Sequence, residues 1–166
     1  MRLFVIHLLL SFYLCSLAID HIHFVPETAG GTIIAFLAIF ISLWLTSYLW
    51  HRKYFRRISR LLTLSAFFVK EFIHSNIKLT KEILTPGFEL TPAVVKVPLT
   101  IRSDGAITAL ANITNLTPGT LIVGISEDKR YLYVHTLYLD GGSREAFKAI
   151  IKNGFESRII AVIEAQ

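Results

Sequence analysis

Two uncharged stretches separated by a short polar loop open the chain. Residues 3–19 hold no charged side chain, and neither do residues 30–50. As a helix the second stretch is about 31 Å long, which matches the hydrocarbon core of a bilayer, and it ends in Trp44, Tyr48 and Trp50. The pattern predicts two transmembrane helices. The first is at the short end of the spanning range, so a cleaved signal peptide is its alternative.

A basic segment follows the second stretch directly, with five cationic residues and no acidic one between positions 51 and 60. These five residues, called the basic collar below, are Arg52, Lys53, Arg56, Arg57 and Arg60. Such charges stay out of the hydrocarbon and accumulate on the cytoplasmic side. Two spans then place the N-terminus in the cytoplasm and the loop 20–29 outside. We therefore expect a multi-pass protein of the cell (inner) membrane whose C-terminal part is also cytoplasmic.

Residues 58–84 follow a helical pattern with polar and apolar sides. The apolar series is Ile58, Leu61, Leu62, Val69, Phe72, Ile73, Asn76 and Ile83. Lys70 and Glu71 lie in the middle, and a lone span would have to bury both. The pattern favours an amphipathic helix, in the membrane interface or packed on partner helices, over a third span, which stays open. Thr85-Pro86-Gly87 ends it.

Beyond residue 87 the chain alternates short strands and helices, which predicts a small cytoplasmic α/β sandwich domain. The predicted elements are a strand 93–99, a helix capped by Ser103-Asp104, a turn 117–120, strands 121–126 and 131–139 around a charged loop 127–130, a turn and cap 140–143, and a helix 144–163 with an interruption near Asn153-Gly154. Alternation between 107 and 113 leaves a strand open for the first helix. The chain thus divides into 1–57, 58–86 and 87–166.

Composition supports a membrane protein and disfavours a nucleic-acid partner. The 166 residues are 53% hydrophobic and 17% charged, against about 25% charged in an average soluble domain. The net charge of +5 belongs to residues 1–84, with nine Lys or Arg against four Asp or Glu, whereas residues 85–166 hold eight of each. The excess is concentrated in the collar, which is typical of a topology signal. A single cysteine, Cys15, excludes an intrachain disulfide.

No motif for catalysis or cofactor binding is present in the sequence. It has no phosphate-binding glycine loop and no nucleophile elbow. His21 and His23, with Asp20 and Glu27, could be considered for a metal, but no further His or Cys completes that site. His7 is the titratable residue of note within the spans and is expected at a helix interface. We expect no enzyme activity, no cofactor, no metal and no small-molecule substrate. We interpret Lys70 and Glu71 as a surface or partner-facing ion pair rather than an intramembrane one.

Two segments carry a resemblance to a known family. Residues 70–77 read Lys-Glu-Phe-Ile-His-Ser-Asn-Ile, and residues 107–120 read Ile-Thr-Ala-Leu-Ala-Asn-Ile-Thr-Asn-Leu-Thr-Pro-Gly-Thr. With Val123–Ser126 and Leu132–His135 downstream, they resemble the E-type component of the multisubunit Mrp (also Mnh or Pha) cation/proton antiporter. The resemblance covers essentially the whole chain. Gly124 departs from it where an aspartate is frequent, Asn115 replaces a threonine or leucine, and the loop 20–29 is longer.

The resemblance implies an accessory subunit of a monovalent cation/proton antiporter. Such a subunit is needed for assembly and so for Na⁺(K⁺)/H⁺ exchange, does not itself conduct ions, and has the other subunits and the lipid bilayer as partners. A homologous subunit of a redox-driven, hydrogenase-type complex and a membrane-anchored adaptor or sensor are the alternatives. The residues expected at interfaces or in structural roles are Lys70, Glu71, Asn76, Asn112, Thr117, Pro118, Gly119 and Thr120. We expect a buried Asn112 to bond the turn backbone, and Gly119 to supply a positive φ.

Overall fold

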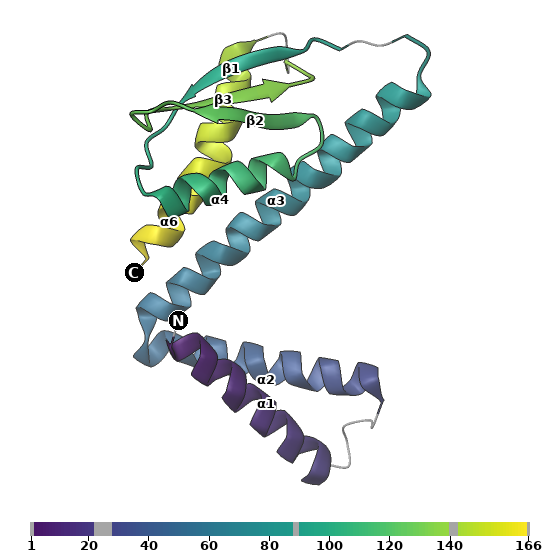
Figure 1. Cartoon of the computed structure of the whole chain (residues 1–166). Helices are drawn as coiled ribbons and strands as arrows, with labels where there is room; N and C mark the ends of the chain where they lie inside the picture. Colours follow the sequence, from purple (N-terminus) through teal and green to yellow (C-terminus); the bar gives the residue numbers. More distant parts are fainter. Residues whose placement is uncertain (1, 22–27, 88–89, 140–142, 166) are drawn as a thin grey trace. The chain divides into compact units, whose positions relative to one another are not determined.

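The computed structural model describes residues 2–21, 28–87, 90–139 and 143–165. Within these ranges the chain is mostly helical and carries one small antiparallel sheet (Figure 1). It divides into two compact units, one ending at Ile58 and the other running from Ser59 to Ala165.

The first unit is built around a pair of apolar helices, α1 (Arg2–His21) and α2 (Ala29–Trp50). Thr28 caps α2, since its hydroxyl accepts a hydrogen bond from the Gly31 N–H at 3.1 Å. In the described part of the chain, α2 is the one helix both long and apolar enough to cross a membrane, and the apolar stretch of α1, Leu3–Ile19, is shorter. Most of the predicted outside loop falls on residues 22–27, which lie outside the described residues.

Helix α3 (Arg52–Leu84) begins one residue after α2 ends, so the basic collar forms its first turns instead of preceding it. The apolar series that predicts an interfacial or partner-packed helix is separate from the residues that meet the domain. The residues that pack against the core of the second unit are Leu64, Phe67 and Phe68. The residues of the predicted series that are exposed are Leu61, Leu62, Val69, Phe72, Ile73 and Ile83. The pattern indicated the helix but not its second apolar side, which meets the domain.

The sheet of the second unit has the order β1-β3-β2, with antiparallel pairing throughout. Its strands are β1 (Ala93–Pro98), β2 (Thr120–Ile125) and β3 (Tyr131–Thr136). Val95 pairs with Val134, and Val134 also pairs with Ile122, which aligns one apolar face. β3 ends three residues before the predicted 139. The Thr136 hydroxyl donates to the Tyr138 carbonyl and accepts from the Tyr138 N–H, which turns the backbone out of the sheet.

Helix α4 (Asp104–Asn115) confirms the helical interpretation of the segment after Ser103. Its buried residues follow a three- to four-residue spacing and are Ala106, Ile107, Leu110 and Thr114. The predicted side-chain cap was wrong in one respect. Ser103 occupies the N-cap position, but its side chain makes no capping hydrogen bond, and Asp104 lies in the first turn, where a carboxylate favours the helix dipole.

The C-terminal helix is continuous but changes its winding. It consists of α5 (Arg144–Ala149), the π-helical segment η2 (Ile150–Glu156) and α6 (Ser157–Glu164). Ser143 caps it, as its hydroxyl accepts from the N–H groups of Glu145 and Ala146. The interruption predicted near Asn153-Gly154 is thus a π-helical segment and not a break.

Helices cover one face of the sheet, so the second unit combines a helical layer with a sheet layer (Figure 1). Val95 and Val97 of β1 and Leu132 and Val134 of β3 supply the sheet side of the core. The helical side is Ile107, Leu110, Phe147, Ile151, Phe155 and Ile159. Because this core also accepts one side of α3, the domain places residues 71–78 of α3 beside the turn 117–120.

Candidate functional site

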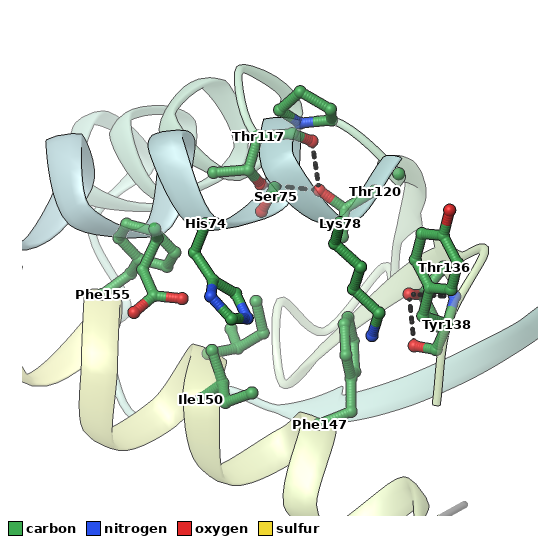
Figure 2. Close-up of a pocket in the computed structure, with 14 residues that line it drawn as sticks. His74, Ser75, Lys78, Thr117, Thr120, Thr136, Tyr138, Phe147, Ile150 and Phe155 are labelled. Carbon is green, nitrogen blue, oxygen red and sulfur yellow. Dashed lines mark hydrogen bonds between the residues drawn. The ribbon is translucent and has the colours of Figure 1, made fainter. Parts of the chain in front are cut away.

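The two segments that carry the family resemblance meet at a cavity of about 60 Å³ in the second unit (Figure 2). Its walls come from α3, the turn 117–120, the end of β3 and the C-terminal helix. The lining side chains include Glu71, His74, Ser75, Lys78, Thr117, Thr120, Tyr138, Phe147 and Phe155. The volume is enough for a few water molecules and too small for an ordinary organic substrate. The geometry therefore indicates a structural junction instead of a substrate pocket.

The turn 117–120 is held by a set of short hydroxyl bonds. The Thr117 hydroxyl donates to the Thr114 carbonyl at 2.6 Å, and the Thr120 hydroxyl lies 2.8 Å from the same carbonyl. Gly119 has φ +86°, which confirms the predicted positive φ, and the Tyr138 ring lies 3.4 Å from the place of an added Cβ. Both conditions favour glycine at this position.

The prediction of a buried, turn-bonding Asn112 was wrong, because Asn112 is exposed. A different asparagine, Asn115, makes a side-chain bond across the turn: it is also exposed, and its side-chain oxygen accepts from the Ile122 N–H of β2 at 2.7 Å. Asn115 is the last residue of α4, so it can reach the first residues of β2 across the turn. Its place at the helix end next to Thr-Pro-Gly-Thr is the signal that could have identified it.

Lys70 and Glu71 form the predicted ion pair at 3.6 Å between the Lys70 Nζ and a Glu71 carboxylate oxygen. The Lys70 side chain is 75% exposed, whereas that of Glu71 is 19% exposed and lines the cavity. This is the geometry of a surface pair and not of a pair enclosed by helices. The Asn76 amide donates to the Phe72 carbonyl of the same helix, and Asn76 lies outside the cavity lining.

Tyr138 lines the cavity next to α3. In Figure 2, His74 and Lys78 point from α3 toward Phe147 and Ile150. The Lys78 Nζ lies 4.3 Å from the centre of the Tyr138 ring, a cation–π distance. Within the described residues the buried Tyr138 hydroxyl has no hydrogen-bond partner. Its burial, and secondarily the negative charge of Glu82, raise the pKa of Tyr138.

The raised pKa of Tyr138 predicts that the domain loses folding stability at alkaline pH. The folded chain binds the phenol proton of Tyr138 more tightly than the unfolded chain does. The protonated tyrosine therefore contributes its full share of the folding stability below the ordinary tyrosine pKa of about 10, and this share is lost as pH rises through the raised pKa. Tyr138→Phe removes this loss. We expect the variant to match the parent near pH 8, because an unpaired hydroxyl is removed, and to exceed it near pH 11. Thermal unfolding of the full chain in detergent measures both. A parallel decline of parent and variant contradicts the assignment.

Two features of η2 have no counterpart among the predictions from sequence. A carboxylate oxygen of Glu156 accepts the N–H groups of Thr100 and Ile101 at 2.5 and 2.9 Å, and this residue is only 1% exposed. Gly154 faces Phe67 of α3 so closely that an added Cβ would lie 2.7 Å from the ring. Neither pairing has a local signature, because each joins residues more than fifty positions apart.

In the first unit, His7 joins three helices. Its ring stacks on Phe40, its Nε2 donates to the Phe40 carbonyl at 3.1 Å, and its Nδ1 lies 2.6 Å from the Tyr54 hydroxyl. A carbonyl only accepts, so Nε2 carries the proton of its bond to Phe40, and Nδ1 and the Tyr54 hydroxyl form the second hydrogen bond. The predicted helix-interface position of His7 is confirmed.

The His7 contacts predict a coupled loss of stability. Both His7→Phe and Tyr54→Phe remove the His7–Tyr54 hydrogen bond, and His7→Phe also removes the bond to the Phe40 carbonyl. Tyr54→Phe is expected to cost about 1 kcal/mol, His7→Phe more, and the double variant little more than His7→Phe alone. Unfolding of the full chain in detergent gives the double-mutant cycle. Strictly additive losses contradict a direct bond between the two side chains.

The five collar residues are not equivalent. The guanidinium of Arg52 lies 5.4 Å from the centre of the Tyr48 ring, and Lys53 and Arg56 are exposed. Arg60 instead donates to the Ala161 carbonyl at 2.5 Å, which attaches α3 to α6. Arg60 therefore has a structural contact that the topology prediction did not include.

No group of three or more potential metal ligands occurs within the described residues. The metal hypothesis considered for the outside loop involves His23 and Glu27, which lie outside the described residues.

Comparison with known proteins connects this fold and its two signature segments to one family. The sequence profile of a family described as Na⁺/H⁺ ion antiporter subunit matches residues 5–162. The chain is 35% identical over 126 residues to the E-type component of the Na⁺/H⁺ antiporter of Alkalihalophilus pseudofirmus, covering 76% of this chain and 78% of that protein. It is 28% identical over 137 residues to the corresponding component of the Na⁺/H⁺ antiporter of Bacillus subtilis, covering 81% and 84%.

One solved structure shows the same fold at low sequence identity. It is a chain of the membrane-bound sulfane sulfur reductase, an archaeal respiratory membrane complex, with a TM-score of 0.51, 18% identity, and coverage of 94% of this chain and 98% of that one. Because the family profile accounts for nearly the whole chain, the protein belongs to the Na⁺/H⁺ ion antiporter subunit family, in the branch that contains the E-type components.

Proposed function

We propose that this chain is an accessory subunit of a multisubunit monovalent cation/proton antiporter in the cell membrane. It is needed for assembly and stability of the complex and does not conduct ions itself. The relatives that it matches over most of their length are named as E-type components of Na⁺/H⁺ antiporters, which supports membership of such a complex.

The proposed topology has α1 and α2 crossing the membrane, with the N-terminus and the C-terminal domain in the cytoplasm. The apolar length of α2 and the collar immediately after it support this orientation. The pairing of α1 with α2 supports the first span, since Cys15 contacts the Thr32 carbonyl through its thiol at 3.7 Å.

The observation that carries the accessory role is the chemistry of the two apolar helices. Cation and proton pathways use ionisable groups inside the bilayer. Leu3–Ile19 and Ala29–Trp50 contain no Asp, Glu, Lys or Arg. Both ring nitrogens of their histidine, His7, form hydrogen bonds, one with the Phe40 carbonyl and one with the Tyr54 hydroxyl. A chain without a free ionisable group in its spans supplies packing surface to the subunits that do carry such groups.

A deletion experiment tests the assembly role. The gene is deleted in the host, and everted membrane vesicles are assayed for cation/proton antiport while native gels and mass spectrometry record the composition of the complex. We expect both antiport and the full complex to be lost, and both to return with the intact gene. A complete, active complex without this chain contradicts the proposal. The same mass spectra show whether redox subunits accompany the complex, which separates a stand-alone antiporter from a redox-driven relative.

A further inference from the structure

Helix α3 is apolar on two opposite sides within the second unit. One side, with Leu64, Phe67 and Phe68, packs against the core. The other side, called the outer face of α3 below, is exposed. Its large apolar residues are Leu61, Leu62, Val69, Phe72, Ile73, Ile77, Ile83 and Leu84. These residues extend over about 36 Å of helix at ~1.5 Å per residue. A stripe of this length is larger than the scattered apolar residues of an ordinary surface.

The packing of the core side excludes a lipid-surrounded helix. A span must be covered by apolar material on all sides, yet α3 carries a domain whose surface holds exposed ion pairs such as Lys129–Asp104. That domain cannot enter hydrocarbon with it. Only the outer face of α3 is available to a second apolar environment.

The composition of the outer face favours lipid over a partner helix. Close helix contacts in membrane complexes are enriched in small residues. Here most exposed positions hold bulky aliphatic side chains or Phe72, and Val69 and Ile73 are each about half exposed, while the small exposed residues include Ser65, Ala66 and Thr80. Asn76, a polar residue within the face, donates its amide to its own helix and so needs no outside partner.

Charge and connectivity identify the kind of lipid surface. Lys70 and Lys81 are eleven residues apart, about three helical turns, so they lie in one line at the edge of the outer face. Both are exposed, although Lys70 also pairs with Glu71. Long basic side chains at the border of an apolar stripe are typical of helices that lie in the interface of anionic membranes. A single residue, His51, separates α3 from the apolar helix α2.

We propose that the outer face of α3 lies in the cytoplasmic membrane interface, with Lys70 and Lys81 on anionic lipid headgroups. The inference rests on the membrane anchorage proposed above. The cytoplasmic domain is then held on the membrane surface by α3 itself, in addition to its contacts with other subunits. The arrangement gives the domain a fixed height above the bilayer.

Nitroxide scanning of the assembled complex in liposomes containing phosphatidylglycerol tests the proposal. In a Cys15→Ser background, single labels are placed at Leu62, Val69 and Ile73, with a label at Glu145 as the aqueous control. Glu145 suits this purpose because its side chain is 80% exposed. We expect the three α3 labels to collide severalfold more with oxygen than with nickel ethylenediaminediacetate, and Glu145 to show the reverse. Low collision with both reagents indicates protein contact, and high nickel collision indicates water. Either result overturns the proposal.

Two further arms make the result specific. A label at Leu37 in α2 tests the anchorage separately. If nickel is excluded at Leu37 but collides often with the α3 labels, only the interface proposal is contradicted. If nickel collides often with the labels at both sites, the proposed membrane anchorage is contradicted as well. Charge reversal by Lys70→Glu with Lys81→Glu is expected to halve the oxygen preference at Ile73 in anionic vesicles and to leave it unchanged in zwitterionic vesicles. An unchanged preference in both overturns the assignment of anionic headgroups.

Discussion

Glu156→Ala is expected to lower the free energy of unfolding by roughly 2–5 kcal/mol, the largest effect of any single side chain in the domain. The buried carboxylate of Glu156 accepts two backbone N–H groups, those of Thr100 and Ile101, in the connection between β1 and α4. Truncation leaves both donors without a partner, and each unpaired buried donor costs about 1–3 kcal/mol. The connection between β1 and α4 leads into α4, and α4 ends at the turn 117–120, which lines the cavity. The loss of these two hydrogen bonds should therefore also destabilise the cavity wall.

Two variants separate the hydrogen-bond effect from general damage. Glu156→Gln keeps an acceptor oxygen, so its free energy of unfolding should fall by about half as much as that of Glu156→Ala. Glu164→Ala, at an exposed position later in the same helix, should leave the free energy of unfolding nearly unchanged. Denaturant unfolding of the full chain in detergent, followed by circular dichroism, gives the three values. Equal losses for Glu156→Ala and Glu164→Ala would show that the buried carboxylate is not the cause.

Gly154→Ala should destabilise the protein by about 1–3 kcal/mol, opposite in sign to the usual gain from replacing a helical glycine by alanine. An added methyl group would stand 2.7 and 2.9 Å from two atoms of the Phe67 ring. That ring has little freedom to withdraw, since Phe155 meets it edge-on and the guanidinium of Arg158 lies 4.0 Å from its centre. The clash therefore acts directly on the contact between α3 and the domain.

A compensating change tests this explanation. In a Phe67→Leu background the ring is absent, so adding Gly154→Ala should cost little or become favourable. The matched control is Gly105→Ala in α4, where an added Cβ meets nothing within 4 Å and where alanine should be neutral or stabilising. The double-mutant cycle is read from unfolding in detergent. Additive losses at positions 67 and 154 would rule out the steric origin.

The elements of this fold were largely predictable because they depend on local patterns. The apolar stretches, the strands 93–99 and 121–126, and Gly119 in its turn follow from side-chain periodicity and turn chemistry, and the structure contains each with small shifts of boundary. The early end of β3 depends on one threonine hydroxyl, at Thr136, which overrides a strand pattern that continues to 139. A single side-chain hydrogen bond of this kind has no periodicity.

The candidate site was predictable only in part. Local motifs identified the turn 117–120 and the segment 70–77 but not that the domain brings them together, because their contact depends on which side of α3 faces the core. Helical spacing indicated one apolar side, expected in the membrane interface or on partner helices, and did not indicate that Leu64, Phe67 and Phe68 pack against the core. The roles of Glu156 and Gly154 depend on the π-helical winding of η2, which sequence patterns do not indicate.

The central claim, that this chain is a required but non-conducting subunit, is tested most directly by reconstitution. The purified chain and the purified complete complex are placed in separate liposomes, and cation/proton exchange is followed with a pH-sensitive dye after an imposed gradient. We predict exchange by the complete complex and none by the chain alone, because the apolar stretches Leu3–Ile19 and Ala29–Trp50 contain no Asp, Glu, Lys or Arg. Exchange catalysed by the chain alone would contradict the account.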